Sequence, residues 1–98
     1  MIRLSSEAER QVAELLQHYA RLGRPEAGRN LITLIDQAAA RIERDPDRGL
    51  PAPRPYPTLA QPGRVWTKAG RYWIAYNTAR PPVILSVFYE TADIPSRV

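Results

Sequence analysis

The sequence lacks cysteine altogether, and it has a single histidine, a single phenylalanine and a single lysine among its 98 residues. Without cysteine there are no disulfides, no thiolate metal ligands and no cysteine nucleophile. One histidine, His18, gives little from which to build a zinc site or a serine–histidine triad. We therefore expect neither a metal nor a cofactor.

Long hydrophobic runs are also missing. No apolar stretch approaches the roughly 18 to 20 residues that a membrane-spanning helix needs, and Glu7 and Arg10 come too early for a signal peptide. We expect a cytoplasmic protein without a membrane segment. The net charge is +4, and all but one of the 14 basic residues are arginine, which suits bidentate contacts with carboxylate or phosphate. This composition indicates an acidic or phosphate-bearing partner.

The length predicts one domain over residues 1–98, because a chain of this size has no surface to spare for a second core. Five of the ten prolines fall between residues 51 and 62. They lie in the one long connection, residues 45–62, which we expect to be extended and anchored on the core by Tyr56 and Leu59.

Two amphipathic helices are predicted before this connection. Ser6 and Glu9 form a capping box that begins the first helix, and Gly23 ends it. The second helix is predicted from Pro25 to Arg44, because the following Asp-Pro pair cannot continue a helix. Helices joined by so few residues must lie antiparallel.

Three strands are predicted after the connection, at residues 64–68, 70–76 and 83–90, with a short strand at residues 2–4 that joins them. In residues 70–76 the side chains alternate, with Tyr72, Ile74 and Tyr76 on one face and Arg71, Trp73 and Ala75 on the other. We therefore predict an α+β domain of order βααβββ, in which an antiparallel helical hairpin packs on one face of a small twisted antiparallel sheet.

This order of elements resembles the ParE/RelE superfamily of toxins from type II toxin–antitoxin modules. The resemblance covers nearly the whole chain. It depends on residues 5–9 (Ser-Ser-Glu-Ala-Glu), on the turn at residues 45–49 (Asp-Pro-Asp-Arg-Gly) and on residues 70–76 (Gly-Arg-Tyr-Trp-Ile-Ala-Tyr), similar to the family's Gly-Arg-Tyr-Arg-x-x-Tyr strand. The long helical hairpin and residues 87–93 are more similar to the ParE branch.

The resemblance to ParE implies a plasmid-stabilisation toxin that arrests growth by inhibiting DNA gyrase and is neutralised by a cognate antitoxin with a ribbon-helix-helix end. The RelE branch implies instead a metal-independent endoribonuclease that cleaves messenger RNA on the ribosome. A degenerate member that survives as a non-toxic regulatory partner is a third reading, because Trp73 and Thr91 stand where the family tends to be basic. A homodimer and a toxin–antitoxin hetero-oligomer both stay open.

Catalysis, if present, would need an acid, a base and cations around the phosphate. The residues that meet this need are Arg64, Lys68, Arg71, Tyr89 and Glu90. The sheet offers no histidine, however, and charged strand residues also serve to oppose aggregation. The residues therefore favour binding over turnover.

A second group of residues consists of candidate partner contacts: Ile32, Trp66, Trp73, Arg41, Arg44 and Arg54. Ile32 lies off the apolar stripe of its helix, where an antitoxin helix can pack. The tryptophans fit either the core or a partner contact. The arginines near the end of the second helix suit the negative end of its dipole, or the docking of an acidic antitoxin tail.

Overall fold

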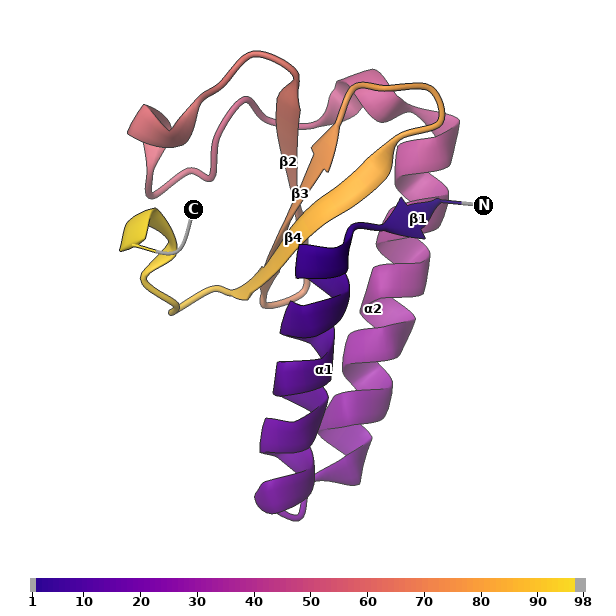
Figure 1. The fold of residues 1–98 in the computed structure, drawn as a ribbon, viewed down its shortest axis with the longest axis vertical. Helices are drawn as coiled ribbons and strands as arrows, with labels where there is room; N and C mark the ends of the chain where they lie inside the picture. The colour runs from indigo at the N-terminus through magenta and orange to yellow at the C-terminus, as the bar shows by residue number, and fades with distance from the viewer. Residues whose placement is uncertain (1, 97–98) are drawn as a thin grey trace.

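Two helices pack against one face of a four-stranded sheet in the computed structural model, which describes residues 2–96 (Figure 1). The helices are α1 (Ser6–Arg21) and α2 (Pro25–Arg44), and the strands are β1 (Arg3–Leu4), β2 (Arg64–Ala69), β3 (Tyr72–Asn77) and β4 (Val83–Tyr89). Short 3₁₀ helices lie at Pro46–Arg48, Pro57–Leu59 and Ile94–Ser96. The α+β class and the βααβββ order are confirmed.

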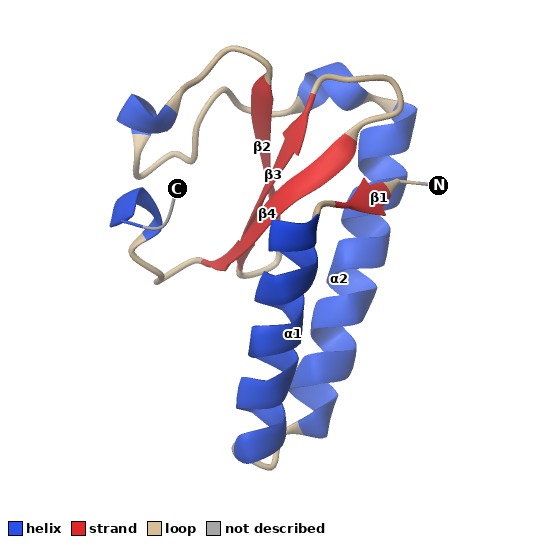
Figure 2. Ribbon diagram, in the orientation of Figure 1, coloured by secondary structure: helices blue, strands red, loops and turns tan. Residues whose placement is uncertain are grey.

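The sheet has the strand order β1-β4-β3-β2 (Figure 2). Both pairings among β2, β3 and β4 are antiparallel, as predicted. β1 instead runs parallel to β4, with Leu4 opposite Ile84, so the sheet is mixed and not wholly antiparallel. The direction of β1 follows from the helix after it. The Ser5 N–H donates to the Ile84 carbonyl at 2.8 Å, and α1 then continues along β4.

The first helix begins one residue earlier than the capping box predicts. Ser5, not Ser6, is the N-cap, and its hydroxyl accepts a hydrogen bond from the Ala8 N–H at 3.1 Å. The same hydroxyl donates to the Leu85 carbonyl at 2.9 Å. Ser5 is the N-cap because one hydroxyl both accepts a hydrogen bond from the first turn of α1 and donates one to a carbonyl of β4.

The helix-facing side of the sheet carries the main core. Tyr72, Ile74 and Tyr76 all point to this side and are buried, which confirms the predicted alternation. They meet the apolar stripes of both helices, including Leu31, Ile35, Ala38 and Ile42 from α2. Burial of this surface, at roughly 25 cal/mol per Å² of apolar area, is the main force that holds the helical hairpin on the sheet.

The other face of the sheet is covered by irregular chain. Residues 45–62 fold back over it together with the 3₁₀ helix Ile94–Ser96, as Figure 1 shows. Tyr56 and Leu59 pack there, as predicted, against a cluster built on Trp66, Trp73 and Phe88. The connection also forms a two-residue bridge between Leu50 and Trp66 at the outer edge of β2. Neither face of the sheet is therefore open.

A two-residue turn, Gly70 and Arg71, joins β2 to β3 and places Arg71 outside the strand to which the sequence pattern assigned it. Gly70 has a φ of +57°, and a side chain there would meet Leu34 of α2 at 2.9 Å. Only glycine fits this position, because the turn needs a positive φ and lies against the helix.

Candidate functional site

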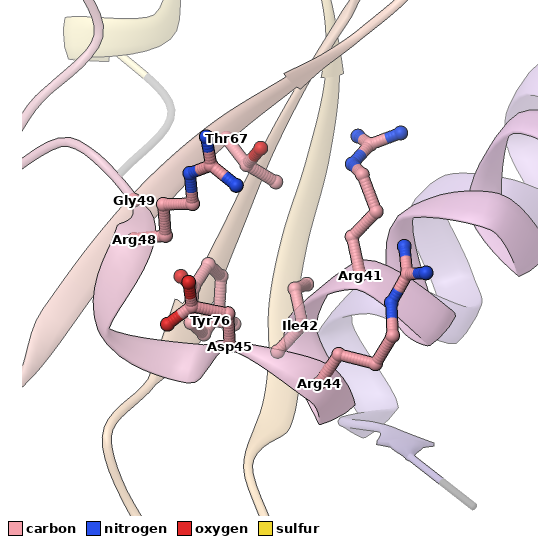
Figure 3. Close-up of a pocket in the computed structure, with 8 residues that line it drawn as sticks. All are labelled: Arg41, Ile42, Arg44, Asp45, Arg48, Gly49, Thr67 and Tyr76. Carbon is pink, nitrogen blue, oxygen red and sulfur yellow. The ribbon is translucent and has the colours of Figure 1, made fainter.

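A cleft of about 470 Å³ lies between the C-terminal end of α2 and β2, an edge strand (Figure 3). Three arginines surround it, and we call it the arginine cleft. Arg48 stands on one side, and Arg41 and Arg44 stand on the other. The rest of the lining consists of Ile42, Asp45, Gly49, Thr67 and Tyr76.

The local sequence explains why the arginines meet. Arg41 and Arg44 are three residues apart near the end of α2, so they lie on the same side of the helix. The Asp45-Pro46 pair ends the helix, and the 3₁₀ turn that follows carries Arg48 to the opposite wall. The motif that stops the helix therefore also builds the cleft.

Gly49 lets the chain pass close to the sheet at this point. A Cβ atom there would lie 2.8 Å from the Trp66 carbonyl oxygen and 2.7 Å from the Tyr76 hydroxyl, and it would collide with the Val65 side chain. The Tyr76 hydroxyl donates a hydrogen bond to the Pro46 carbonyl at 2.8 Å. Burial raises the pKa of Tyr76 above its ordinary value. The close approach at Gly49 and the hydrogen bond from Tyr76 to Pro46 together hold this wall of the cleft against β2 and β3.

The charges in the cleft are mostly unopposed. Arg41 Nη2 donates to the Lys68 carbonyl at 3.3 Å. Within residues 2–96, none of the three arginines of the cleft has a carboxylate within 4.0 Å of its guanidinium nitrogens. One carboxylate, that of Asp45, lines the cleft. Arg41 and Arg44 also lie at the negative end of the α2 dipole, where positive charge stabilises the helix.

Four of the five predicted catalytic residues gather at the turn of the β2–β3 hairpin, and we call them the hairpin-tip cluster. Lys68 Nζ lies 3.2 Å from Glu90 Oε2. Arg71 Nη1 lies 3.3 Å from the Tyr89 hydroxyl and 3.8 Å from Glu90 Oε1. The hydrogen bond with Tyr89 raises the pKa of Arg71 above its ordinary value. Each cation in the cluster is thus paired with a neighbouring acidic or phenolic group.

Arg64, the fifth of these residues, lies apart from the hairpin-tip cluster. Arg64 stands opposite Asn77 at the start of β2, whereas Lys68 stands opposite Trp73 near its end. The four residue steps from Arg64 to Lys68 place their Cα atoms about 13 Å apart along the strand.

No family model and no curated protein matches the chain. Within residues 2–96 neither helix is long and apolar enough to cross a membrane. Among the same residues no three or more histidine or acidic side chains gather where a metal ion would bind. The function of the chain therefore has to be inferred from the geometry of its own residues.

A second hollow, of about 540 Å³, lies between α1 and α2 near the turn that joins them, and we call it the hairpin groove after the helical hairpin. Its lining is mainly apolar and includes Leu16, Tyr19, Pro25 and Ile32. Ile32 is 41% exposed, in line with its predicted position off the apolar stripe. Gly28, whose Cβ would lie 3.2 Å from Leu16 Cδ2, allows the helices to approach closely below this groove.

Of the other predicted partner contacts, Trp66, Trp73 and Arg54 line neither hollow. Trp66 and Trp73 are 0% and 2% exposed, because the chain that covers the second face of the sheet buries them. They are core residues, and their assignment as partner contacts is corrected. Arg54 is exposed on the proline-rich connection, outside the arginine cleft. Arg41 and Arg44 do line the cleft, together with Thr67 and Tyr76, which were not predicted as partner contacts.

Proposed function

We propose that the chain is the toxin component of a type II toxin–antitoxin module, which acts in the cytoplasm as a ParE-like inhibitor of DNA gyrase and is neutralised by a cognate antitoxin. Two features support this. The βααβββ order, with the helical hairpin on the sheet, agrees with the fold that the resemblance implies. The hairpin groove gives an exposed apolar surface of the kind that an amphipathic partner helix covers.

The hairpin-tip cluster favours binding over turnover, and this observation carries the proposal. A general base or acid must be available to the substrate. Here Glu90 interacts with Lys68 and Arg71, and the Tyr89 hydroxyl accepts from Arg71. The histidine of the chain lies on α1 and not in the sheet. Proton transfer at this site would therefore compete with these ion pairs.

Controlled expression in a bacterial host tests the proposal. We expect growth arrest together with gyrase-linked DNA breaks, and we expect relief when an antitoxin gene from the same operon is expressed with it. Lys68→Ala and Arg71→Ala should leave the arrest intact, because the cluster takes no part in chemistry. Absence of arrest on expression of the unaltered chain would contradict the proposal and favour a non-toxic regulatory partner, in line with the burial of Trp73 and the presence of Thr91.

The alternative function is a RelE-like, ribosome-dependent endoribonuclease. It is favoured by one observation, that Lys68, Arg71, Tyr89 and Glu90 lie together. A translating extract distinguishes the two functions. Cleavage of messenger RNA by the unaltered protein, lost in Arg71→Ala and Glu90→Gln, would replace the gyrase proposal with this one.

A further inference from the structure

The arginine cleft brings together three arginines that have no carboxylate partner among residues 2–96. Some exposed cations in residues 2–96 pair with nearby carboxylates, as Arg10 does with Glu7 and Glu14 on α1, and others, such as Arg54, have no carboxylate within 4.0 Å but do not line the cleft. Arg41, Arg44 and Arg48 have no such partner there, although they stand around one hollow (Figure 3). Three guanidiniums around one cleft repel one another unless an anion lies between them. The cleft is therefore complementary to an acidic ligand.

The neighbouring strand edge adds a donor for a peptide backbone. Trp66 uses both its N–H and its carbonyl, at 2.7 Å each, to bond Leu50 on the outer side of β2. Because this orientation repeats every second residue, the backbone groups of Lys68 also face outward. The Lys68 carbonyl accepts from Arg41, and its N–H has no acceptor among residues 2–96. One strand-edge amide thus faces outward beside the arginines.

The surroundings favour carboxylates over a phosphodiester chain. The Asp45 carboxylate lines the cleft, and the α2 C-terminus directs its negative dipole end toward it. Both groups repel any anion, and a phosphodiester chain, with a charge at every nucleotide, has no neutral group to place beside them. An extended peptide instead presents side chains on one face at intervals of about 6.7 Å, with neutral backbone between them. Such a segment can bring two carboxylates to opposite walls while a carbonyl oxygen meets the edge amide.

We propose that the arginine cleft and the adjoining Lys68 edge of β2 are the docking site for an extended acidic segment of a protein partner. Carboxylates at alternate positions bind Arg41 and Arg48 in bidentate fashion, and Arg44 adds a third cation at the mouth. This inference rests on the proposed function only for the identity of the partner, which is the antitoxin. It adds to the hairpin groove a second, electrostatic contact on the other end of α2.

The test uses the purified full chain and a synthetic eight-residue peptide with capped ends that alternates glutamate and threonine. A peptide with glutamine in place of glutamate is the matched probe. In calorimetry at low salt we expect the glutamate peptide to bind at least about tenfold more tightly than the glutamine peptide. Charge-assisted hydrogen bonds are stronger than neutral ones. Its affinity should fall steeply as salt is raised.

Substitutions of the arginines test whether the peptide binds in the arginine cleft. Arg41→Gln combined with Arg48→Gln should lower the affinity for the glutamate peptide about tenfold or more. Arg54→Gln removes an exposed arginine outside the cleft, and it should leave the affinity unchanged. Thermal unfolding checks that each variant is folded. Since the substituted side chains are exposed, the variants should keep their stability.

Three results would overturn the inference. They are equal binding of the glutamate and glutamine peptides, equal loss of affinity in Arg54→Gln and in the cleft variant, and tighter binding of a single-stranded oligonucleotide than of the peptide at equal salt. The growth assay is separate from these readings. Peptide binding by a chain that does not arrest growth would keep the docking site and reject the toxin, whereas arrest without peptide binding would do the reverse.

Discussion

The side-chain oxygen of Gln11 accepts a hydrogen bond from the backbone N–H of Val87 at 2.7 Å. Gln11 is 4% exposed, the one buried polar side chain found among residues 2–96. β1 pairs with β4 only through Arg3 and Leu4. Beyond that point α1 replaces the missing strand, with the Gln11 side chain in the place of a backbone carbonyl.

We expect Gln11→Leu to destabilise the fold by about 1 to 3 kcal/mol, because the buried Val87 N–H would lose its acceptor. Gln17→Leu makes the same chemical change at an exposed position of α1 and should change stability by less than about 0.5 kcal/mol. Urea unfolding measures both. Similar free energies of unfolding for the two variants would mean that the hydrogen bond of Gln11 does not contribute to stability.

Gly49→Ala should destabilise the protein by about 1 to 3 kcal/mol, because the new methyl group meets Val65, the Tyr76 hydroxyl and the Trp66 carbonyl. Part of this loss should be recovered when Val65→Ala is added, since one of the colliding groups is then removed. A double-mutant cycle from chemical denaturation gives the coupling between the two sites. Strictly additive effects would contradict the close approach of the connection to β2.

Alkaline pH should weaken the fold through Tyr72. Burial, reinforced by the hydrogen bond with Tyr19, raises the pKa of Tyr72 well above the ordinary tyrosine value. The unfolded chain therefore releases this proton at a lower pH than the folded chain does. The contribution of Tyr72 to stability is complete below about pH 10 and is lost as the pH rises further.

We therefore expect the free energy of unfolding of Tyr72→Phe to fall less steeply than that of the unaltered chain between about pH 9 and pH 11. Tyr56→Phe removes a phenol from the other side of the sheet and serves as the comparison. Chemical denaturation at a series of pH values gives the slopes. An unchanged slope in Tyr72→Phe would show that this tyrosine is not responsible.

Ile32→Asp should leave the stability nearly unchanged, because the side chain is 41% exposed, and it should weaken neutralisation by an antitoxin helix in the hairpin groove. Leu22→Asp alters another exposed hydrophobic residue, 55% exposed, that does not line the groove. Growth rescue on co-expression of the antitoxin is the measurement. Equal rescue of both variants would place the partner elsewhere.

Local signals in the sequence were sufficient for most of the fold. The helix α2 begins at Pro25 and ends at Arg44 as predicted, because a proline at its start and an Asp-Pro pair after its end leave little choice. The N-cap was misplaced by one residue because Ser5 and Ser6 are equally good caps in isolation. A contact with β4, 80 residues away, decides between them.

The candidate site was less predictable, because it too depends on contacts between residues far apart in the sequence. Arg41 and Arg44 stood out by their cluster near a helix end, but Thr67 and Tyr76 reach the cleft through strand pairing that no local pattern contains. The burial of Trp66 and Trp73 depends on how the proline-rich connection folds back. Gln11 reads as an ordinary polar residue of an amphipathic helix until the length of β1 is known.

The bridge between Leu50 and Trp66 has a consequence for self-association. An edge strand can pair with the edge strand of another copy of the same chain and so start aggregation. This pairing requires a continuous row of free amides and carbonyls. Leu50 and Arg41 interrupt that row on β2 and leave a lone amide at Lys68. One free amide can take part in the docking that we propose, but it does not provide the continuous row that a fibril needs.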